Sequence, residues 1–316
     1  MNKPIKIIFM GTPHFSVPYF KSLINDKSFE VKAVITQSDK PTGRKQIITP
    51  SPVKMVAQEN KLPVFQPEKL KDNGEIVEQL KKIEPDLIVV VAYGQIIPKE
   101  ILALPKLGNV NVHPSLLPKY RGASPIQNAI LNNETSTGIT IMLMDEKMDH
   151  GPMLAQKEII LDGTEDNKSL HQKMSDNDST DFLITTIKKF IDHEIQPTVQ
   201  DETLATYCKL ITKEEAKINW ADSAKNISSK IRAFYPWPVA WTNLDNKRVK
   251  IFPPIVIIEN KKQPGEIFEY ENSLAVGCGD NSIVISSMQI EGKNKILSSD
   301  FIMGHKDAIE NKFFSF

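Results

Sequence analysis

The sequence predicts an α/β fold in two domains, a larger one with a mostly parallel sheet and a smaller one made of short strands. Two continuous apolar runs, at 5–10 and 86–92, are typical of strands that are covered on both faces. The amphipathic stretch 73–83 lies between them, and such strand–helix alternation indicates a parallel sheet with crossover helices. After residue 239, short alternating segments follow one another at the close spacing of a small barrel or sandwich.

The first domain is expected to contain further elements of the same two kinds. Apolar runs at 31–37 and 138–144 predict two more strands. Residues 166–193 have helical character, but the poor helix formers at 175–180 are expected to divide that helix in two. The first domain is therefore predicted to span residues 1–193.

A polar segment without periodicity, at 194–207, predicts a linker to a second domain at 208–316. Thr212 and Glu215 have the spacing of a capping box at the start of a short helix. A longer helical stretch and then five alternating segments follow, at 223–234, 239–244, 248–258, 265–270, 273–278 and 282–289. Turn residues separate the alternating segments, as expected for the strands of a small barrel or sandwich.

Composition indicates an ordinary soluble globular protein. The chain has 316 residues, which suits two domains, and its 39 Lys and Arg balance its 39 Asp and Glu. This balance excludes a polybasic nucleic-acid binder, so any contact with nucleic acid has to come from local patches. The two cysteines, Cys208 and Cys278, fit a reducing cytoplasm. No apolar run approaches the roughly 18 residues of a membrane span, and a cytoplasmic protein without a membrane partner is expected.

One predicted strand, at 109–113, carries polar side chains on a single face. Because side chains alternate along a strand, Asn109, Asn111 and His113 share that face. In a parallel sheet ligands bind outside the carboxyl ends of the strands, which places Asn111 and His113 nearest the functional edge. An amide and an imidazole can both donate hydrogen bonds to an oxygen that becomes negative during acyl transfer. The alternative is a polar strand terminus without chemistry.

Six segments resemble, in order and spacing, the folate-dependent formyltransferases that act on methionyl-tRNA. They are 9–18, 37–54, 85–98, 111–127, 138–154 and 231–241. The resemblance implies a Rossmann-like amino-terminal domain and a smaller, OB-like β-barrel domain that binds tRNA. It also implies transfer of a formyl group from 10-formyltetrahydrofolate to the α-amino group of initiator methionyl-tRNA, which yields N-formylmethionyl-tRNA and tetrahydrofolate for translation initiation.

The same resemblance implies a catalytic set of Asn111, His113 and Asp149. Asn111 and His113 would bind the oxyanion, and Asp149 would hold the imidazole and accept the amine proton, directly or through water. The final proton acceptor stays open. His150 stands where the family usually has a small residue or Thr, and it is expected to be a partly exposed loop residue.

By resemblance, the pterin of the folate lies against two segments, Val91, Ala92, Tyr93 and Gly94, and Ser115, Leu116, Leu117 and Pro118. No metal is expected, because the chain lacks closely spaced Cys and His ligands. The first strand–helix turn, at 11–15, lacks the GxGxxG fingerprint, which counts against a dinucleotide cofactor.

A basic loop between 37 and 54 predicts a tRNA contact. Lys40, Arg44 and Lys45 resemble the family insertion that grips the acceptor end of the tRNA, whereas on charge alone a solvated basic loop is the simpler interpretation. Trp237 and Trp241 are expected to pack in a core rather than to stack on bases. A monomer is expected.

Three other functions stay open. The chain could formylate a small amine, such as glycinamide ribonucleotide or an amino sugar nucleotide. It could instead hydrolyse 10-formyltetrahydrofolate, since a similar Asn–His–Asp set serves that reaction. A non-catalytic RNA-binding protein is the third possibility, and the intact Asn111, His113 and Asp149 set argues against it.

Overall fold

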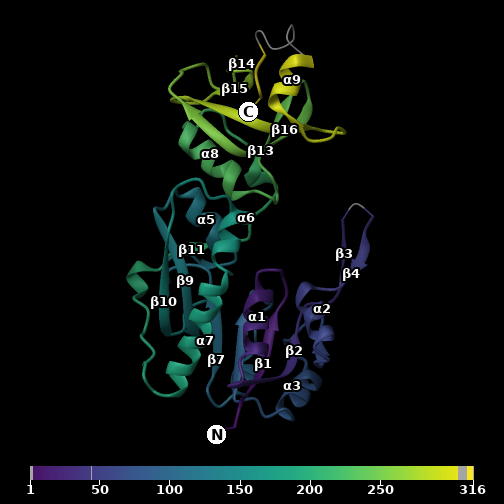
Figure 1. Cartoon of the computed structure of the whole chain (residues 1–316), viewed down its shortest axis with the longest axis vertical. Coiled ribbons are helices and arrows are strands. Elements are labelled where there is room, and N and C mark those ends of the chain that lie inside the picture. Colours follow the sequence, from purple (N-terminus) through teal and green to yellow (C-terminus); the bar gives the residue numbers. More distant parts are fainter. Residues whose placement is uncertain (1–2, 44, 305–311, 316) are drawn as a thin grey trace. The chain divides into compact units, whose positions relative to one another are not determined.

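The structure, a computed structural model, describes residues 3–43, 45–304 and 312–315 (Figure 1). The chain forms two compact units, and both include segments that are distant in sequence. Unit 1 comprises Met1–Gly122, Gly138–Ile159 and His171–Tyr207, and unit 2 comprises Ala123–Thr137, Ile160–Leu170 and Cys208–Phe316.

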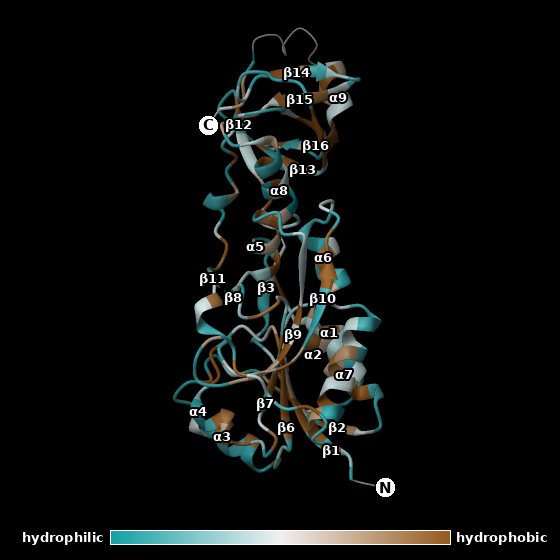
Figure 2. Ribbon diagram, turned by 90° about the vertical axis from the view of Figure 1, so that its left-hand side faces the viewer, coloured by the Kyte–Doolittle hydropathy of each residue, from teal (hydrophilic) through white to brown (hydrophobic). Residues whose placement is uncertain are grey.

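Unit 1 is built around a seven-stranded, mostly parallel sheet, which confirms the predicted fold class. In sheet order the strands are β10 (Met153–Ile160), β9 (Ser136–Leu143), β7 (Asn109–His113), β6 (Leu87–Val91), β1 (Ile5–Gly11), β2 (Phe29–Ile35) and β5 (Val64–Phe65). The pairs from β7 to β5 are parallel, whereas β9 runs antiparallel to β7. Figure 2 shows hydrophobic residues gathered along the central strands.

Helices cover both faces of this sheet because its strands alternate between two apolar faces. On one face Ile8 and Met10 of β1 share a core with side chains of α3 (Gly74–Lys81) and α4 (Lys99–Leu102). On the other face Phe9 stacks on Phe20 of α1, with ring centroids 4.6 Å apart. The helices in contact with α1 (Ser16–Asn25) are α2 (Pro52–Glu59) and α7 (Asn177–Ile191).

The helix predicted at 166–193 is divided as expected, into α6 (Asn167–Lys173) and α7. The Asp176 side chain caps α7 by accepting a 2.8 Å hydrogen bond from Ser179 N. Most of the poor helix formers at 175–180 therefore lie in the first turn of α7, where a capping carboxylate satisfies a free backbone N–H.

The smaller pairings of the chain lie in its connecting segments. The hairpin β3 (Lys40–Thr42) and β4 (Ile47–Thr49) occupies the predicted basic loop. Two-residue strands β8 (Arg121–Gly122) and β11 (Tyr207–Cys208) pair with each other. The segment predicted as a linker thus contains a strand and the 3₁₀ turn Glu202–Leu204. Within the three described ranges, no helix is long and apolar enough to cross a membrane.

Unit 2 is a curled antiparallel sheet with helices α5 (Pro125–Leu131), α8 (Ala224–Ala233) and α9 (Ser298–Gly304). Its strands, in sheet order, are β12 (Trp241–Leu244), β13 (Lys247–Ile258), β16 (Ser282–Ile290), β15 (Ser273–Gly277) and β14 (Ile267–Tyr270), and β17 (Ile296–Leu297) pairs with β16. Residues 313–315 bridge to Asn243 of β12 and to Glu266 beside β14. The last segment thereby joins the two edge strands of the curl.

The capping box at the start of unit 2 has the expected contacts. Thr212 N donates to Glu215 Oε2 at 2.6 Å, and Glu215 N contacts Thr212 Oγ1 at 3.4 Å. The helix itself is a single 3₁₀ turn, Glu214–Ala216. The motif was recognisable from sequence, but the length of the helix was not.

The tryptophans differ from the prediction. Trp237 is 53% exposed, so the expectation that it packs in a core is wrong. It lies between two prolines in the turn after α8, so it belongs to neither the buried face of a helix nor that of a strand. Trp241 is partly buried beneath the guanidinium of Arg248, 4.0 Å from the ring centroid. The buried tryptophan is Trp220, which stacks on Phe314.

Candidate functional site

The end of β7 places two polar side chains in a nearly closed environment. His113 is 4% exposed and Asn111 is 8% exposed. Asn109 shares their face by alternation, but its Nδ2 donates to Leu102 O at 2.6 Å, so this amide is tied to the backbone. The Asn111 amide makes no hydrogen bond to any residue of the described ranges. Asn111 therefore retains two N–H donors for a bound group.

The surroundings of His113 determine which ring nitrogen faces the site. Nε2 lies 3.0 Å from Tyr120 O, and Nδ1 lies 3.6 Å from Asp149 Oδ1. Because a carbonyl oxygen only accepts, Nε2 carries a hydrogen and donates to it. The gap at Nδ1 is too long for a hydrogen bond. Nδ1 is therefore the nitrogen left to interact with Asp149 and a substrate together.

Asp149 reaches His113 from a tightly folded loop. Its backbone is in the left-handed region, with φ of 50°, and its Oδ2 accepts a 2.8 Å hydrogen bond from Gly122 N. The side chain is 16% exposed. The loop folds back after β9 because Leu143 N donates to Pro152 O at 2.8 Å. One carboxylate oxygen is thus anchored and the other faces the imidazole.

Gly151 belongs to the same loop, at a point where backbone segments approach closely. A Cβ at this position would lie 2.0 Å from Leu143 O and 3.3 Å from Asp145 N. Backbone atoms cannot yield as a flexible side chain can, so only glycine fits here without displacing the loop. The proximity of Asp149 to His113 depends on this approach.

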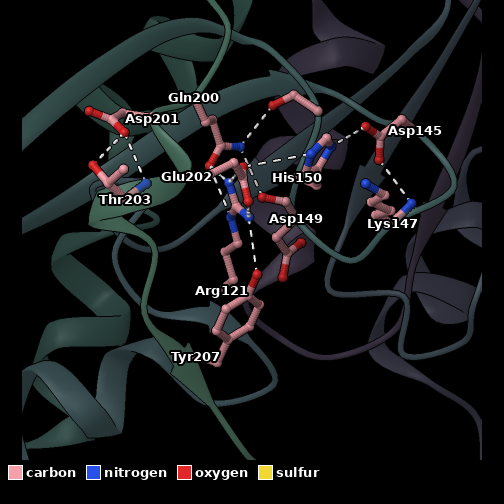
Figure 3. Close-up of polar contacts among 11 residues, drawn as sticks. Arg121, Asp145, Lys147, Asp149, His150, Gln200, Asp201, Glu202, Thr203 and Tyr207 are labelled. Atoms are coloured by element: carbon pink, nitrogen blue, oxygen red, sulfur yellow. Dashed lines mark hydrogen bonds and ion pairs between the residues drawn. The ribbon is translucent and has the colours of Figure 1, made fainter.

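His150 contacts two carboxylates other than that of Asp149. Its Nδ1 lies 2.6 Å from Asp145 Oδ2 and its Nε2 lies 3.6 Å from Glu202 Oε1 (Figure 3). The side chain is 30% exposed, which agrees with the expected partly exposed loop residue. The ring therefore joins neighbouring carboxylates and does not compete with His113.

Replacing His150 by Thr is expected to change kcat by less than about threefold, because exposed ion pairs contribute little and the ring does not touch the Asp149 carboxylate. Steady-state formylation kinetics of the His150→Thr protein, with matched folate concentrations, measure this. A loss above tenfold would mean that the ring contributes to the reaction itself.

Sequence reasoning missed Gln200 and Arg121, which also contact the Asp149 loop. Gln200 is 4% exposed and Arg121 is fully buried. Gln200 Nε2 donates to Asp149 O at 2.9 Å, and Arg121 Nη2 donates to Gln200 Oε1 at 2.8 Å. A lone Gln in a polar, aperiodic segment carries no pattern that predicts burial. Arg121 stood within a quoted motif, but its partners are about 80 residues away in sequence.

The segment expected to contact the pterin has a rigid backbone beyond β6. Ser16 Oγ donates to Val91 O at 2.6 Å, and both Thr12 Oγ1 and Gln37 Nε2 donate to Tyr93 O at 2.9 Å. The Tyr93 ring packs into the apolar core, where burial raises the pKa of its phenol to about 12. Of this segment only Ala92 and Gly94 are exposed, so a ligand here would meet backbone.

In the second segment expected to contact the pterin, buried residues alternate with half-buried ones. Ser115 and Leu117 are buried, and Leu117 N already donates its hydrogen to Thr140 Oγ1 at 3.0 Å. Leu116 and Pro118 are half-buried and provide the accessible apolar surface. A separate open hollow of about 360 Å³ lies beside Gly94, lined by Gln37, Ser38, Lys40, Glu68, Lys69, Gly94 and Gln95.

Two of the basic residues predicted to contact tRNA, Lys40 and Lys45, lie on the β3–β4 hairpin. Lys40 and Lys45 are exposed, and the Lys40 amine contacts Gln37 Oε1. Arg44 lies outside the described residues. Two apolar side chains, Ile47 and Ile48, are 61% and 70% exposed on the same hairpin. The predicted basic loop thus contains a β-hairpin, and basic and apolar side chains are both exposed on it. Among described residues, no group of three or more His, Cys, Asp or Glu is placed to hold a metal ion.

Comparison with known proteins assigns the family. The family model "Formyl transferase" matches residues 5–187, and "Formyl transferase, C-terminal domain" matches residues 210–306. The methionyl-tRNA formyltransferase of Clostridium novyi is 42% identical over 97% of this chain and 99% of its own length. That of Halalkalibacterium halodurans is 44% identical over 95% of each chain.

A solved structure shares the fold at lower identity. The N-formyltransferase of Helicobacter canadensis, in complex with folinic acid and dTDP-3-aminofucose, superposes with a TM-score of 0.66 at 20% identity, over 89% of this chain and 98% of its own. The family predicted from the six sequence segments is confirmed. With both family models matched in order and with relatives that align over nearly its whole length, the chain belongs to the formyl transferase family.

Proposed function

We propose that this protein transfers the formyl group of 10-formyltetrahydrofolate to the α-amino group of methionyl-tRNA, giving N-formylmethionyl-tRNA and tetrahydrofolate. Relatives named methionyl-tRNA formyltransferase align over both of its family domains, which supports an acceptor of this size. The observation that carries the chemistry is the approach of Asp149 Oδ1 to His113 Nδ1, 3.6 Å apart, at the end of the strand that also holds Asn111.

The reaction forms a C–N bond between the amine and the formyl carbon and breaks the bond from that carbon to N10 of the folate. The α-amine of an aminoacyl ester has a pKa near 8 or below, so a large fraction is neutral and nucleophilic. As the amine attacks, the formyl oxygen becomes an oxyanion. The Asn111 amide is suited to donate to it, and His113 Nδ1 can donate as well when the ring is in its charged form, with a hydrogen on both nitrogens.

Asp149 is suited to the proton that the attacking amine loses. Its Oδ2 is held by Gly122 N, which leaves Oδ1 toward the imidazole. It can stabilise a charged imidazole ring and accept the proton directly or through water, while N10 of the departing folate gains one. We propose Asn111, His113 and Asp149 as the catalytic residues on this basis.

The folate donor supplies a formyl group that is already activated for transfer. The residues that fit it are the exposed backbone at Ala92 and Gly94 and the accessible apolar surface of Leu116 and Pro118. Hydrogen bonds hold the backbone beside Ala92 in place, so it can offer N–H and C=O groups to a flat heterocycle without rearrangement. Tyr93, Ser115 and Leu117 are proposed to shape this surface from behind.

For the tRNA we propose Lys40 and Lys45 of the β3–β4 hairpin, together with Arg44, as a contact to the acceptor end, and residues 208–316 as a further tRNA-binding domain. Basic side chains attract the phosphate backbone without reading sequence. We also retain residues 194–207 as the connection between 1–193 and this domain.

One assay tests the function. The protein is incubated with formyl-labelled 10-formyltetrahydrofolate and, separately, methionyl-tRNA, uncharged tRNA, an amino sugar nucleotide, glycinamide ribonucleotide, or buffer alone. Label on methionyl-tRNA, released as N-formylmethionine on mild ester hydrolysis, is the expected result. Label on a small amine, or free labelled formate in buffer alone, would replace the proposal with one of its rivals.

Changing Asp149 to Asn is expected to lower kcat about 100-fold and to leave the KM for the folate within about threefold, since general acid–base groups act in the transition state rather than in binding. Initial rates over a range of folate concentrations at saturating methionyl-tRNA measure both constants. An effect confined to KM would contradict the assigned role.

A further inference from the structure

The Asp149 loop is held by a single side-chain amide from a distant part of unit 1. Gln200 Nε2 donates to Asp149 O at 2.9 Å and to Gly151 O at 2.8 Å. One nitrogen therefore bridges two carbonyls of the same loop, and each of its two hydrogens has an acceptor. These two hydrogen bonds hold the carbonyl groups of Asp149 and Gly151, and they thereby fix the backbone from which the Asp149 side chain extends. Asp149 itself is in the left-handed region, with φ of 50°.

The orientation of the Gln200 amide is itself determined by Arg121. Arg121 Nε and Nη2 lie 3.1 and 2.8 Å from Gln200 Oε1. A guanidinium only donates, so Oε1 has to face Arg121 and Nε2 has to face the loop. The amide cannot flip without placing N–H groups against N–H groups. The contact at Arg121 thus specifies the contact at Asp149.

Arg121 is held in turn by contacts to Glu202 and Tyr207 (Figure 3). Its Nη1 and Nη2 lie 3.0 and 2.6 Å from the two carboxylate oxygens of Glu202, and Tyr207 Oη lies 3.2 Å from Nη1. The bidentate pairing matches the planar fork of a guanidinium to a carboxylate. The Glu202 hydrogen bond raises the pKa of Arg121 further, so the cation persists throughout the working range.

The short strand β8, which contains Arg121, also contacts the Asp149 carboxylate directly. Gly122 follows Arg121 in the chain, and Gly122 N donates to Asp149 Oδ2 at 2.8 Å. Arg121 N donates to Thr206 O at 2.8 Å, which attaches β8 to the segment that carries Gln200 and Glu202. The carboxylate and the backbone of Asp149 are therefore held by two ends of one hydrogen-bonded unit.

We propose that Gln200, oriented by Arg121, is a positioning residue that sets the Asp149 carboxylate against His113 for formyl transfer. The proposal rests on the proposed function, because it assigns Gln200 an effect through the catalytic role of Asp149. A segment that resembles a linker in sequence thereby acts on the reaction without touching the substrate. Supporting groups of this kind hold a catalytic side chain within about half an ångström of its productive place.

The variant that tests this is Gln200→Met, which keeps the length of the side chain and removes both donors and the acceptor. It is expected to lower kcat about 30-fold and leave the folate KM within about threefold, because misplacing a catalytic group by a fraction of an ångström acts on the transition state. Thr203→Ala is the matched control. Thr203 lies in the same segment, and its N and Oγ1 both donate to the neighbouring Asp201 carboxylate, at 2.9 and 2.7 Å. The kcat of the Thr203→Ala protein is expected to stay within about twofold of the kcat of the parent protein.

A double-mutant cycle separates positioning from general destabilisation. Gln200→Met is combined with Asp149→Asn, and kcat is measured for the parent, both single variants and the double variant. If Gln200 acts through Asp149, the second substitution lowers kcat by no more than about threefold in the Asp149→Asn background. Thermal unfolding of each protein is followed in parallel, and rates are taken well below every transition. Should Gln200→Met not fold, Gln200→Glu, which keeps an acceptor for Arg121, takes its place.

Each result decides the matter. Losses that multiply in the double variant, or a Gln200→Met kcat equal to that of the parent, would overturn the positioning role and leave the proposed function intact. An Asp149→Asn kcat close to the parent value would overturn both the role of Asp149 and the inference built on it. A parent protein that formylates no methionyl-tRNA would instead remove the proposed acceptor.

Discussion

Replacement of His113 by alanine is expected to lower kcat by about three orders of magnitude, with little change in the KM for the folate. One oxyanion donor is worth roughly a hundred- to a thousandfold in kcat, and this change also deprives Asp149 of its partner. His113 is 4% exposed, so the alanine leaves a small cavity at the site and water does not restore a donor with the same direction. Single-turnover formylation with protein in excess measures the chemical step without interference from product release.

A matched control for this variant is His193→Ala. His193 is an exposed residue in the turn after α7, and its removal is expected to leave kcat within about twofold. A His113→Ala protein that loses less than tenfold, with an unfolding transition like that of the parent, would show that another group stabilises the oxyanion.

Gly151→Ala is expected to affect both stability and catalysis. The new Cβ would lie 2.0 Å from Leu143 O, a backbone atom within the central sheet, so the loop rather than the strand has to move. Such overpacking costs about 2–3 kcal/mol in the free energy of unfolding. Because the displaced loop carries Asp149 and both acceptors of Gln200, kcat is expected to fall by roughly 100-fold or more as well.

Urea denaturation and steady-state kinetics measure the two effects on the same preparations. Gly74→Ala is the control, since Gly74 lies in the first turn of α3. Apart from its chain neighbours and the backbone of its own helix, no described part of the protein comes within 4 Å of an added Cβ. The free energy of unfolding of the Gly74→Ala protein is expected to change by less than about 1 kcal/mol, toward higher stability, because alanine favours helix. Wild-type stability for Gly151→Ala would show that the loop adapts freely and does not determine the place of Asp149.

Much of the fold followed from local patterns. Continuous apolar runs marked β1 and β6 because both faces of those strands are covered, and alternation marked the strands of unit 2. The alternation at 109–113 also brought Asn111 and His113 to the end of one strand. These features depend on residues near one another in sequence, which is where pattern reasoning is strongest.

The features that escaped prediction depend on contacts between distant residues. Asp149 follows β9, an antiparallel strand, so the rule for carboxyl ends of parallel strands does not place it at the site. It arrives there because its loop folds back, and only the family resemblance indicated its role. Gln200 is buried where it pairs with Arg121, which is 79 residues away in sequence, and a local sequence pattern cannot predict a contact between such distant residues. Trp237 looked like a core residue because it is large and apolar, yet it lies in a turn and is 53% exposed.

The placement of the indole rings has a practical consequence for spectroscopy. All three tryptophans of the sequence, at 220, 237 and 241, belong to unit 2, while the seven-stranded sheet of unit 1 has none. Tryptophan fluorescence excited at the red edge of indole absorption therefore reports the unfolding of unit 2 and does not report that of unit 1. Circular dichroism in the far ultraviolet sees both, so the separation between the two melting curves measures directly how cooperatively the halves of this chain unfold.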